Sequence, residues 1–124
     1  MSAVTPQLFP GRVAAVFGFL GVALGACGAH GGIHNMLVQN GTLENWETAV
    51  HYHLVHAVVL LVIARGATFP RVAWWLFAAG IVIFSGTLYV LALTNVRWLG
   101  AITPVGGLAL LGGWLALVFE KPRG

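Results

Sequence analysis

Two histidines beside an apolar run are the residues of this sequence best suited to chemistry. His53 and His56 directly precede the uninterrupted apolar stretch at residues 57–64. Ionisable side chains are costly inside a bilayer, so those found there usually serve a ligand, an ion or a proton path. Neutral imidazole is also a common metal ligand, and a spacing of three places both rings on one face of a helix. The pair is therefore the first candidate site.

A metal site on this pair would need more ligands. Structural zinc sites take four protein ligands, so two histidines are too few. His30 would have to dip about two helical turns to join them, and no Cys or acidic side chain is expected at their depth. A weaker candidate lies nearer the surface, where Glu47 and His51 are four residues apart and Glu44 and His34 are nearby. That set could bind Zn or Cu, although solvated side chains at a helix end are the simpler explanation.

Three other uses of the buried pair stay open. Two histidines three apart on one helix cannot reach opposite faces of a haem, so a partner helix or subunit would have to supply one ligand. A relay of His56, His53 and His30 could carry protons to the outer surface, but the inner half of each helix has no matching polar residues. The third use is structural, in hydrogen bonds between helices at about 0.6 kcal/mol each. The candidate partners are Ser85, Thr87, Tyr89 and Thr103. We expect no cofactor, with a divalent metal as the alternative.

The elements that hold these residues are expected to be membrane helices. The chain is 59% hydrophobic and only 7% charged, whereas soluble domains carry about 25% charged residues. The formal net charge of +3 comes from scattered arginines and a short basic tail. No basic run or aromatic-basic pattern favours nucleic-acid binding. We therefore expect membrane lipids to surround the protein and no nucleic acid to bind it.

Four segments are long enough to cross a membrane, since a span needs about 20 apolar residues. They cover residues 13–29, 43–65, 72–94 and 98–119, in one all-α transmembrane domain of residues 1–124. Lys and Arg are retained on the cytoplasmic side. One side holds Arg12, Arg65, Arg71, Lys121 and Arg123; the other holds only Arg97, and the 30–49 loop has neither type. Both termini are thus expected in the cytoplasm, in a multi-pass protein of the cell inner membrane.

Tryptophans and small residues add detail to this frame. Trp residues favour membrane interfaces. We expect Trp46 and Trp98 at the outer interface, and Trp74, Trp75 and Trp114 nearer the inner one. Gly21 and Gly25 form a GxxxG pattern, which we assign to packing within the bundle rather than to dimerisation. A homo-oligomer or a membrane-protein partner stays open. The segment ending at Cys27 also resembles a lipoprotein signal, but we favour a retained helix in which Cys27 is a small packing residue.

The second segment has two distinct faces. Asn40-Gly41 is a turn signal and Thr42 a plausible helix cap. Spacings of three and four predict a buried stripe, which comprises Trp46, Ala49, His53, His56 and Leu60. Glu44, Glu47 and His51 fall on roughly the opposite, water-exposed face. We expect the histidine pair to face Ser85 and Tyr89 on the third segment. His30, at the outer end of the first segment, should lie level with Tyr89. Gly86, beside Ser85, would let another helix come close.

Four blocks of sequence carry a resemblance to a known family. They are Gly25 to Gly31, Trp46 to Ala57, Phe77 to Tyr89, and Leu99 to Gly107. In this order they resemble the domain of unknown function 423 family, small four-helix inner-membrane proteins related to eukaryotic transmembrane protein 256. Cys27 stands where family members usually have an aromatic residue, and His34 and His51 fall outside the family blocks. The resemblance implies the fold but no activity.

We therefore expect a compact four-helix bundle that acts as a small binding or accessory protein. Its outer-half polar cluster comprises His30, His53, His56, Ser85, Tyr89 and Thr103. The alternative is an oligomeric channel or transporter subunit that uses the buried histidines to handle protons or metal ions. No embedded Asp or Glu, Ser-His-Asp set or phosphate-binding loop favours an enzyme. An outer-face chemistry of Glu47 and His51 is the only enzymatic option that stays open.

Overall fold

A computed structural model describes residues 8–121 of the chain. Within this range all regular structure is helical. The elements are α1 (Leu8–Ala29), α2 (Gly31–Asn40), α3 (Leu43–Arg65), α4 (Arg71–Gly80), η1 (Ile81–Ser85), α5 (Gly86–Thr94), η2 (Arg97–Ala101) and α6 (Thr103–Val118). Four helical stretches are long and apolar enough to cross a membrane: Leu8–Ala29, Leu43–Arg65, Arg71–Thr94 and Arg97–Val118. The expected class, an all-α protein with four transmembrane helices, is confirmed.

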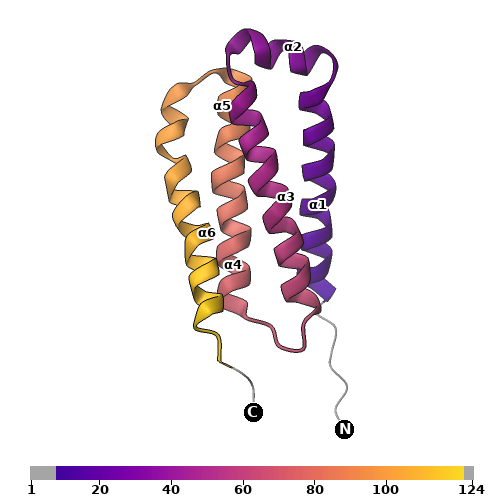
Figure 1. Cartoon of the computed structure of the whole chain (residues 1–124), viewed down its shortest axis with the longest axis vertical. Coiled ribbons are helices and arrows are strands. Elements are labelled where there is room, and N and C mark those ends of the chain that lie inside the picture. The colour runs from indigo at the N-terminus through magenta and orange to yellow at the C-terminus, as the bar shows by residue number, and fades with distance from the viewer. Residues whose placement is uncertain (1–7, 122–124) are drawn as a thin grey trace.

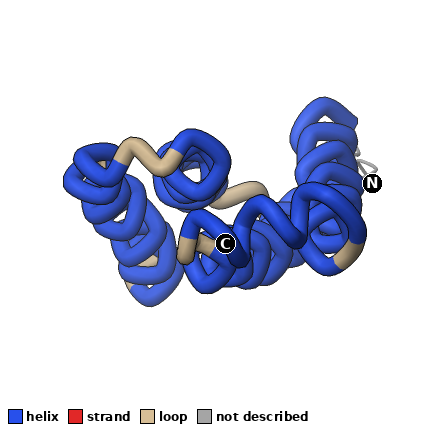
Figure 2. The backbone as a smooth tube through the Cα atoms, turned by 90° about the horizontal axis from the view of Figure 1, so that it is seen from above, coloured by secondary structure: helices blue, strands red, loops and turns tan. Residues whose placement is uncertain are grey.

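The four long helices stand side by side, and α2 runs across the same end of α1 and α3, which it joins (Figure 1). Both ends of the described chain lie at the opposite end, which we name the basic end because Arg12, Arg65 and Arg71 are there. Helix α1 packs mainly against α3, while α6 packs against α4 and η1. Seen from above, α1 and α6 lie at opposite edges of the molecule (Figure 2). The arrangement is therefore more open than the compact bundle expected from the sequence.

The first helix begins at Leu8, earlier than the expected start at residue 13. Pro10 falls in its first turn, where an N–H would have no intrahelical partner and the ring is tolerated. Arg12 lies inside the helix, with its side chain exposed. One exposed arginine does not end a helix, so the charge was a poor marker of the helix start.

Helix α2 occupies part of the segment expected to be a loop at residues 30–49. Gly31 is its first residue and Gly41 follows its last, with φ angles of 72° and 71°, in the left-handed region where glycine carries no steric cost. The N–H of Gly41 donates to Val38, which closes the last turn. Leu37 is fully buried from this helix, against Trp46. A helix this short with glycines at both ends lacks the long apolar period that marks a span.

The third span is not a uniform α-helix, because η1 is one turn of π-helix in its middle. Gly106 of α6 packs directly on the backbone of Ile83 and Phe84 in this turn. A Cβ at position 106 would collide with main-chain atoms, so the close approach requires glycine. π-turns inside α-helices often occur at functional sites. The sequence reading missed this feature.

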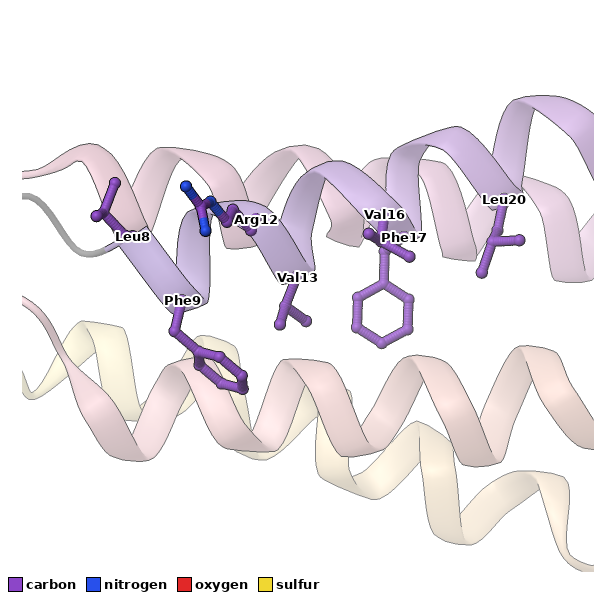
Figure 3. Close-up of a pocket in the computed structure, with 7 residues that line it drawn as sticks. All are labelled: Leu8, Phe9, Arg12, Val13, Val16, Phe17 and Leu20. Carbon is purple, nitrogen blue, oxygen red and sulfur yellow. The ribbon is translucent and has the colours of Figure 1, made fainter.

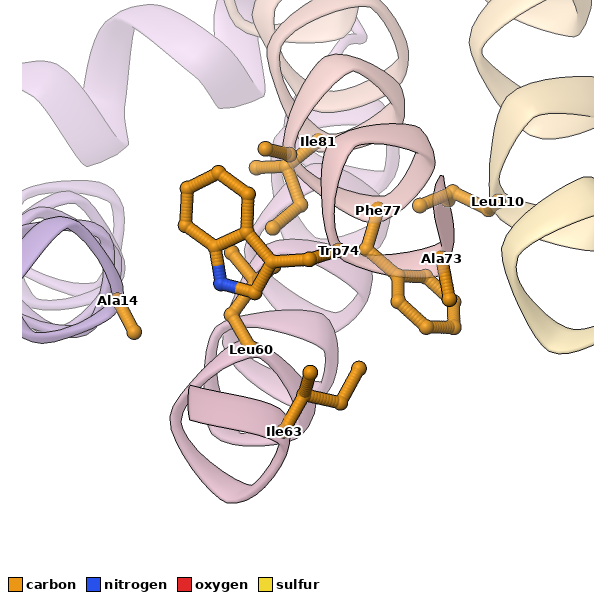
Figure 4. Packing of buried hydrophobic residues seen from close by; sticks show 9 residues of the cluster. Ala14, Leu60, Ile63, Ala73, Trp74, Phe77, Ile81 and Leu110 are labelled. Carbon is orange, nitrogen blue, oxygen red and sulfur yellow. The ribbon is translucent and has the colours of Figure 1, made fainter. Parts of the chain in front are cut away.

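The larger apolar core lies toward the basic end and includes Ala14, Leu60, Trp74, Phe77 and Leu110 (Figure 4). A smaller cluster under α2 contains Leu37, Trp46 and Ala92. Trp46 and Trp74 lie in the first turns of α3 and α4, near the ends of these spans, but both rings are buried among helices rather than facing lipid. Their large rings fill interhelical space, while Trp75 and Trp98 remain exposed.

Small residues on α1 let α3 approach, as a packing role of the GxxxG pattern requires. A Cβ at Gly21 would meet Leu54 at 2.6 Å, and one at Gly25 would meet Val50 at 3.2 Å. The expected close approach at Gly86 is not present, since a Cβ there meets no atom within 4 Å. Cys27 is exposed rather than packed, because it lies on the side of α1 that turns away from α3.

Candidate functional site in the polar residues of the spans

The buried stripe of α3 is confirmed. Its members Trp46, Ala49, His53, His56 and Leu60 are at most 5% exposed. Glu44, Glu47 and His51 are exposed on the other side of the helix. The two central histidines are therefore inside the protein, where every polar ring atom needs a partner.

His53 connects α3 to α1 and α5. Its Nε2 lies 2.8 Å from the carbonyl oxygen of Phe17, and its Nδ1 lies 2.8 Å from the hydroxyl of Tyr89. A carbonyl only accepts, so Nε2 must carry the proton. Nδ1 then accepts a hydrogen bond from the Tyr89 hydroxyl. The ring is neutral in this arrangement, and both of its nitrogens are satisfied.

His56 has the opposite tautomer and a different set of partners. Its Nδ1 lies 2.8 Å from the carbonyl oxygen of Tyr52, one turn back on α3, and must donate to it. The indole N–H of Trp114 on α6 donates to Nε2 over 3.0 Å. An indole N–H can only donate, so this bond requires an unprotonated Nε2.

The two histidines thus face different helices and do not form one site. The lone pair of each ring, which a metal would need, already accepts a hydrogen bond from Tyr89 or from Trp114. Among residues 8–121, no three His, Cys, Asp or Glu side chains gather closely enough to hold an ion. This applies equally to the surface candidates Glu47 and His51. The observed geometry therefore does not fit a shared metal ion or an axial haem ligand on this pair.

Hydroxyl side chains form hydrogen bonds between the spans. Of these, only the Tyr89 hydroxyl is bonded to a histidine among the described residues. Ser85 is 1% exposed and donates to the carbonyl of Ala49 over 2.7 Å, joining η1 to α3. Thr87 and Thr103 lie 2.8 Å apart, joining α5 to α6. Ser85 was expected to face the histidines. It bonds the backbone instead, because Ala49 lies one turn from His53 on the same buried stripe.

His30 is not part of this cluster. It is the exposed residue between α1 and α2, where the chain turns across the end of the bundle. The alternative of a relay through His56, His53 and His30 is therefore not assembled among the described residues. The sequence also did not predict a hydrogen bond between α3 and α5 at the α2 end of the protein. Thr42, at the N-cap position of α3, donates across the bundle to the carbonyl of Ala92 over 2.8 Å rather than capping its own helix.

A groove between α3, η1 and α6 opens beside His56. Its volume is about 540 Å³. The lining includes Tyr52, His56, Phe84, Gly107, Leu111 and Trp114. The Tyr52 ring is nearly parallel to that of His56 (5°, centroids 6.2 Å apart) and lies 4.6 Å from that of Phe84. We call this space the α3–α6 groove. Its lining comes from three elements that are distant in the sequence, so no spacing within one segment predicts it.

Comparisons with known proteins agree with this architecture. A family model described as "Protein of unknown function (DUF423)" matches residues 24–107. The UPF0382 membrane protein YwdK of Bacillus subtilis is 43% identical over 110 residues, covering 84% of this chain and 88% of that protein. UPF0382 membrane proteins of Staphylococcus haemolyticus (45%; 82% and 84% covered) and Staphylococcus saprophyticus (48%; 80% and 84% covered) are similar. No solved structure matches. The chain therefore belongs to the DUF423 family of membrane proteins, which has no assigned activity.

Proposed function

We propose that the protein is a small binding or accessory protein that takes a lipid-soluble molecule with a hydrogen-bonding group into the α3–α6 groove. One observation carries the proposal. Tyr52 is 41% exposed and lines the groove, and its hydroxyl takes part in none of the side-chain hydrogen bonds found among residues 8–121. The remaining polar residues of the spans, including His53, Ser85 and Thr103, hold the helices together beside it.

The depth of Tyr52 makes its free hydroxyl informative. At about 1.5 Å per residue it lies about 14 Å along α3 from Leu43, near the middle of a hydrocarbon core of about 30 Å. Water is scarce there, and an unsatisfied hydroxyl costs about 1–3 kcal/mol. A guest with a carbonyl or hydroxyl group would remove that cost, while the apolar walls would take the rest of its surface.

The same geometry favours binding over catalysis or transport. His56 is the one titratable group besides Tyr52 in the groove lining, and both of its nitrogens are already bonded. The groove therefore offers no free imidazole or carboxylate to act as an acid or base, and its one unbonded titratable group is the phenol of Tyr52. The alternative, an oligomeric channel or transporter subunit, gains no support, because the buried polar side chains form separate bonded pairs rather than a line.

The test compares what co-purifies with four forms of the protein. Gly107→Leu fills the groove without altering Tyr52, since a Cβ there makes only ordinary contact with Phe84 at 3.7 Å. Tyr52→Phe removes the free hydroxyl alone. Gly18→Leu is the matched control, because a Cβ at Gly18 meets no atom within 4 Å.

Mass spectrometry of organic extracts should find one lipid-soluble species at near equal molar ratio in the wild type and in Gly18→Leu. Gly107→Leu should lose it, and Tyr52→Phe should retain less. Equal content in all four forms, or none in any folded form, would refute the proposal.

We further propose that the basic end faces the cytoplasm, in the inner membrane of a cell. Arg12, Arg65 and Arg71 support this orientation, while Arg97 is the one Lys or Arg at the α2 end within residues 8–121. A C-terminal fluorescent protein should then fluoresce, and a C-terminal alkaline phosphatase should be inactive. The reverse pattern would place the basic end outside.

A further inference from the structure

A second hollow lies between α1 and α4, away from the α3–α6 groove. Its volume is about 390 Å³, and its walls include Phe9, Val13 and Phe17 from α1 and Trp74, Trp75 and Val82 from the third span. Figure 3 shows Phe9, Val13 and Phe17 projecting from α1 toward the neighbouring helix. We call this space the α1–α4 cleft. It exists because α1 packs mainly against α3 and α2.

Trp74 supplies an unpaired donor at this cleft. Its side chain is 1% exposed, and its Nε1 is the one buried side-chain polar atom without a partner among residues 8–121. The indole extends from α4 toward Ala14 on α1 (Figure 4). Two other indoles are satisfied, since Trp46 donates to the carbonyl of Leu24 and Trp114 to His56. An unpaired N–H in an apolar setting calls for an acceptor from outside the chain.

Charge and depth identify the acceptor. Trp74 is three residues into α4, which places it about 4–5 Å from the basic end. The α1 residues of the cleft also line an adjoining hollow of about 510 Å³ that includes Arg12 (Figure 3). An apolar trough with a donor at this depth and a cation beside it matches a phospholipid, which carries acyl chains, ester carbonyls and a phosphate in that order.

We propose that the α1–α4 cleft binds one phospholipid from the leaflet at the basic end. An acyl chain lies along Val13 and Phe17, an ester carbonyl accepts from Trp74 Nε1, and the phosphate pairs with Arg12. Trp74 is only 1% exposed and its indole extends toward Ala14 on α1, so binding requires a small shift of α1.

The test uses phosphatidylglycerol in two forms, the ordinary diester and the dialkyl ether that lacks ester carbonyls. Both are titrated onto the detergent-solubilised full chain and counted by native mass spectrometry. The wild type should bind the diester about five- to tenfold more tightly, the factor expected of one hydrogen bond. Trp74→Phe should bind both forms equally. Trp98→Phe, exposed at the other end, is the matched control and should behave as wild type.

Arg12→Gln should weaken both lipids while keeping the preference for the diester, since it alters only the phosphate contact. Equal binding of the two lipids by the wild type would overturn the proposal, and so would a preference that survives Trp74→Phe. The comparison of lipids on the wild type remains decisive if a variant fails to fold. The outcome is independent of the α3–α6 groove, because the two spaces share no lining residue.

Discussion

A double-mutant cycle on His53 and Tyr89 tests whether the histidine pair belongs to two separate bonded networks. The singles are His53→Ala and Tyr89→Phe, and the double variant combines them. The cost of the cavity left by His53→Ala is the same with and without the Tyr89 hydroxyl, so it cancels in the cycle. The remaining coupling energy reports the hydrogen bond between Nδ1 of His53 and the Tyr89 hydroxyl, which are 2.8 Å apart. A parallel cycle pairs His56→Ala with Trp114→Phe, whose bond spans 3.0 Å.

Interhelical hydrogen bonds in membrane proteins contribute about 0.6 kcal/mol on average and up to about 1.7 kcal/mol. His53 is 4% exposed and its bond to Tyr89 is short, so we expect a coupling of about 1–1.5 kcal/mol. His53→Ala should cost more than this alone, because the bond to the Phe17 carbonyl is lost as well. For the longer bond of His56 with Trp114 we expect a coupling of about 0.6–1 kcal/mol.

The free energy of unfolding is measured in mixed micelles by titration with a denaturing detergent. A crossed cycle of His53→Ala with Trp114→Phe is the control, because the structure places no bond between these side chains. Its coupling should be near zero. A coupling below about 0.3 kcal/mol for His53 and Tyr89, or a crossed coupling as large as the direct ones, would refute the two-network description.

Three further predictions follow from single contacts. Nitrogen NMR should find the proton on Nε2 of His53 and on Nδ1 of His56; the same tautomer in both would contradict the assigned bonds. Gly106→Ala should destabilise the fold by about 2–3 kcal/mol, because its Cβ collides with the backbone of Phe84. Gly107→Ala should be neutral or stabilising by up to about 1 kcal/mol. Similar melting temperatures for the two variants would argue against the close packing of α6 on η1. Thr42→Val should cost about 1 kcal/mol, because the carbonyl of Ala92 then keeps only the longer hydrogen bond from Asn40 Nδ2 (3.3 Å), and Thr42→Ser should restore the stability. Equal melting temperatures for the Val and Ser variants would show that the bond from Thr42 to Ala92 contributes nothing.

The sequence by itself determined the number and class of the spans. Apolar runs of sufficient length between charged or turn residues must cross a membrane as helices, because lipid satisfies no backbone group. The three- and four-residue spacing from Trp46 to Leu60 also determined which side of α3 is buried. These are local properties of a helix, so they can be read from one segment at a time. The short helix α2 and the π-turn η1 were missed, since neither has a long period.

Only the tertiary structure decided what the buried groups touch. His53 and His56 share one face of α3, yet α1 and α5 take one ring and α6 takes the other, which depends on where the neighbouring helices lie. The same holds for the free hydroxyl of Tyr52 and the unpaired indole of Trp74. A hydrogen bond between spans is set by the depth, rotation and approach of two helices. No spacing within a single helix contains that information.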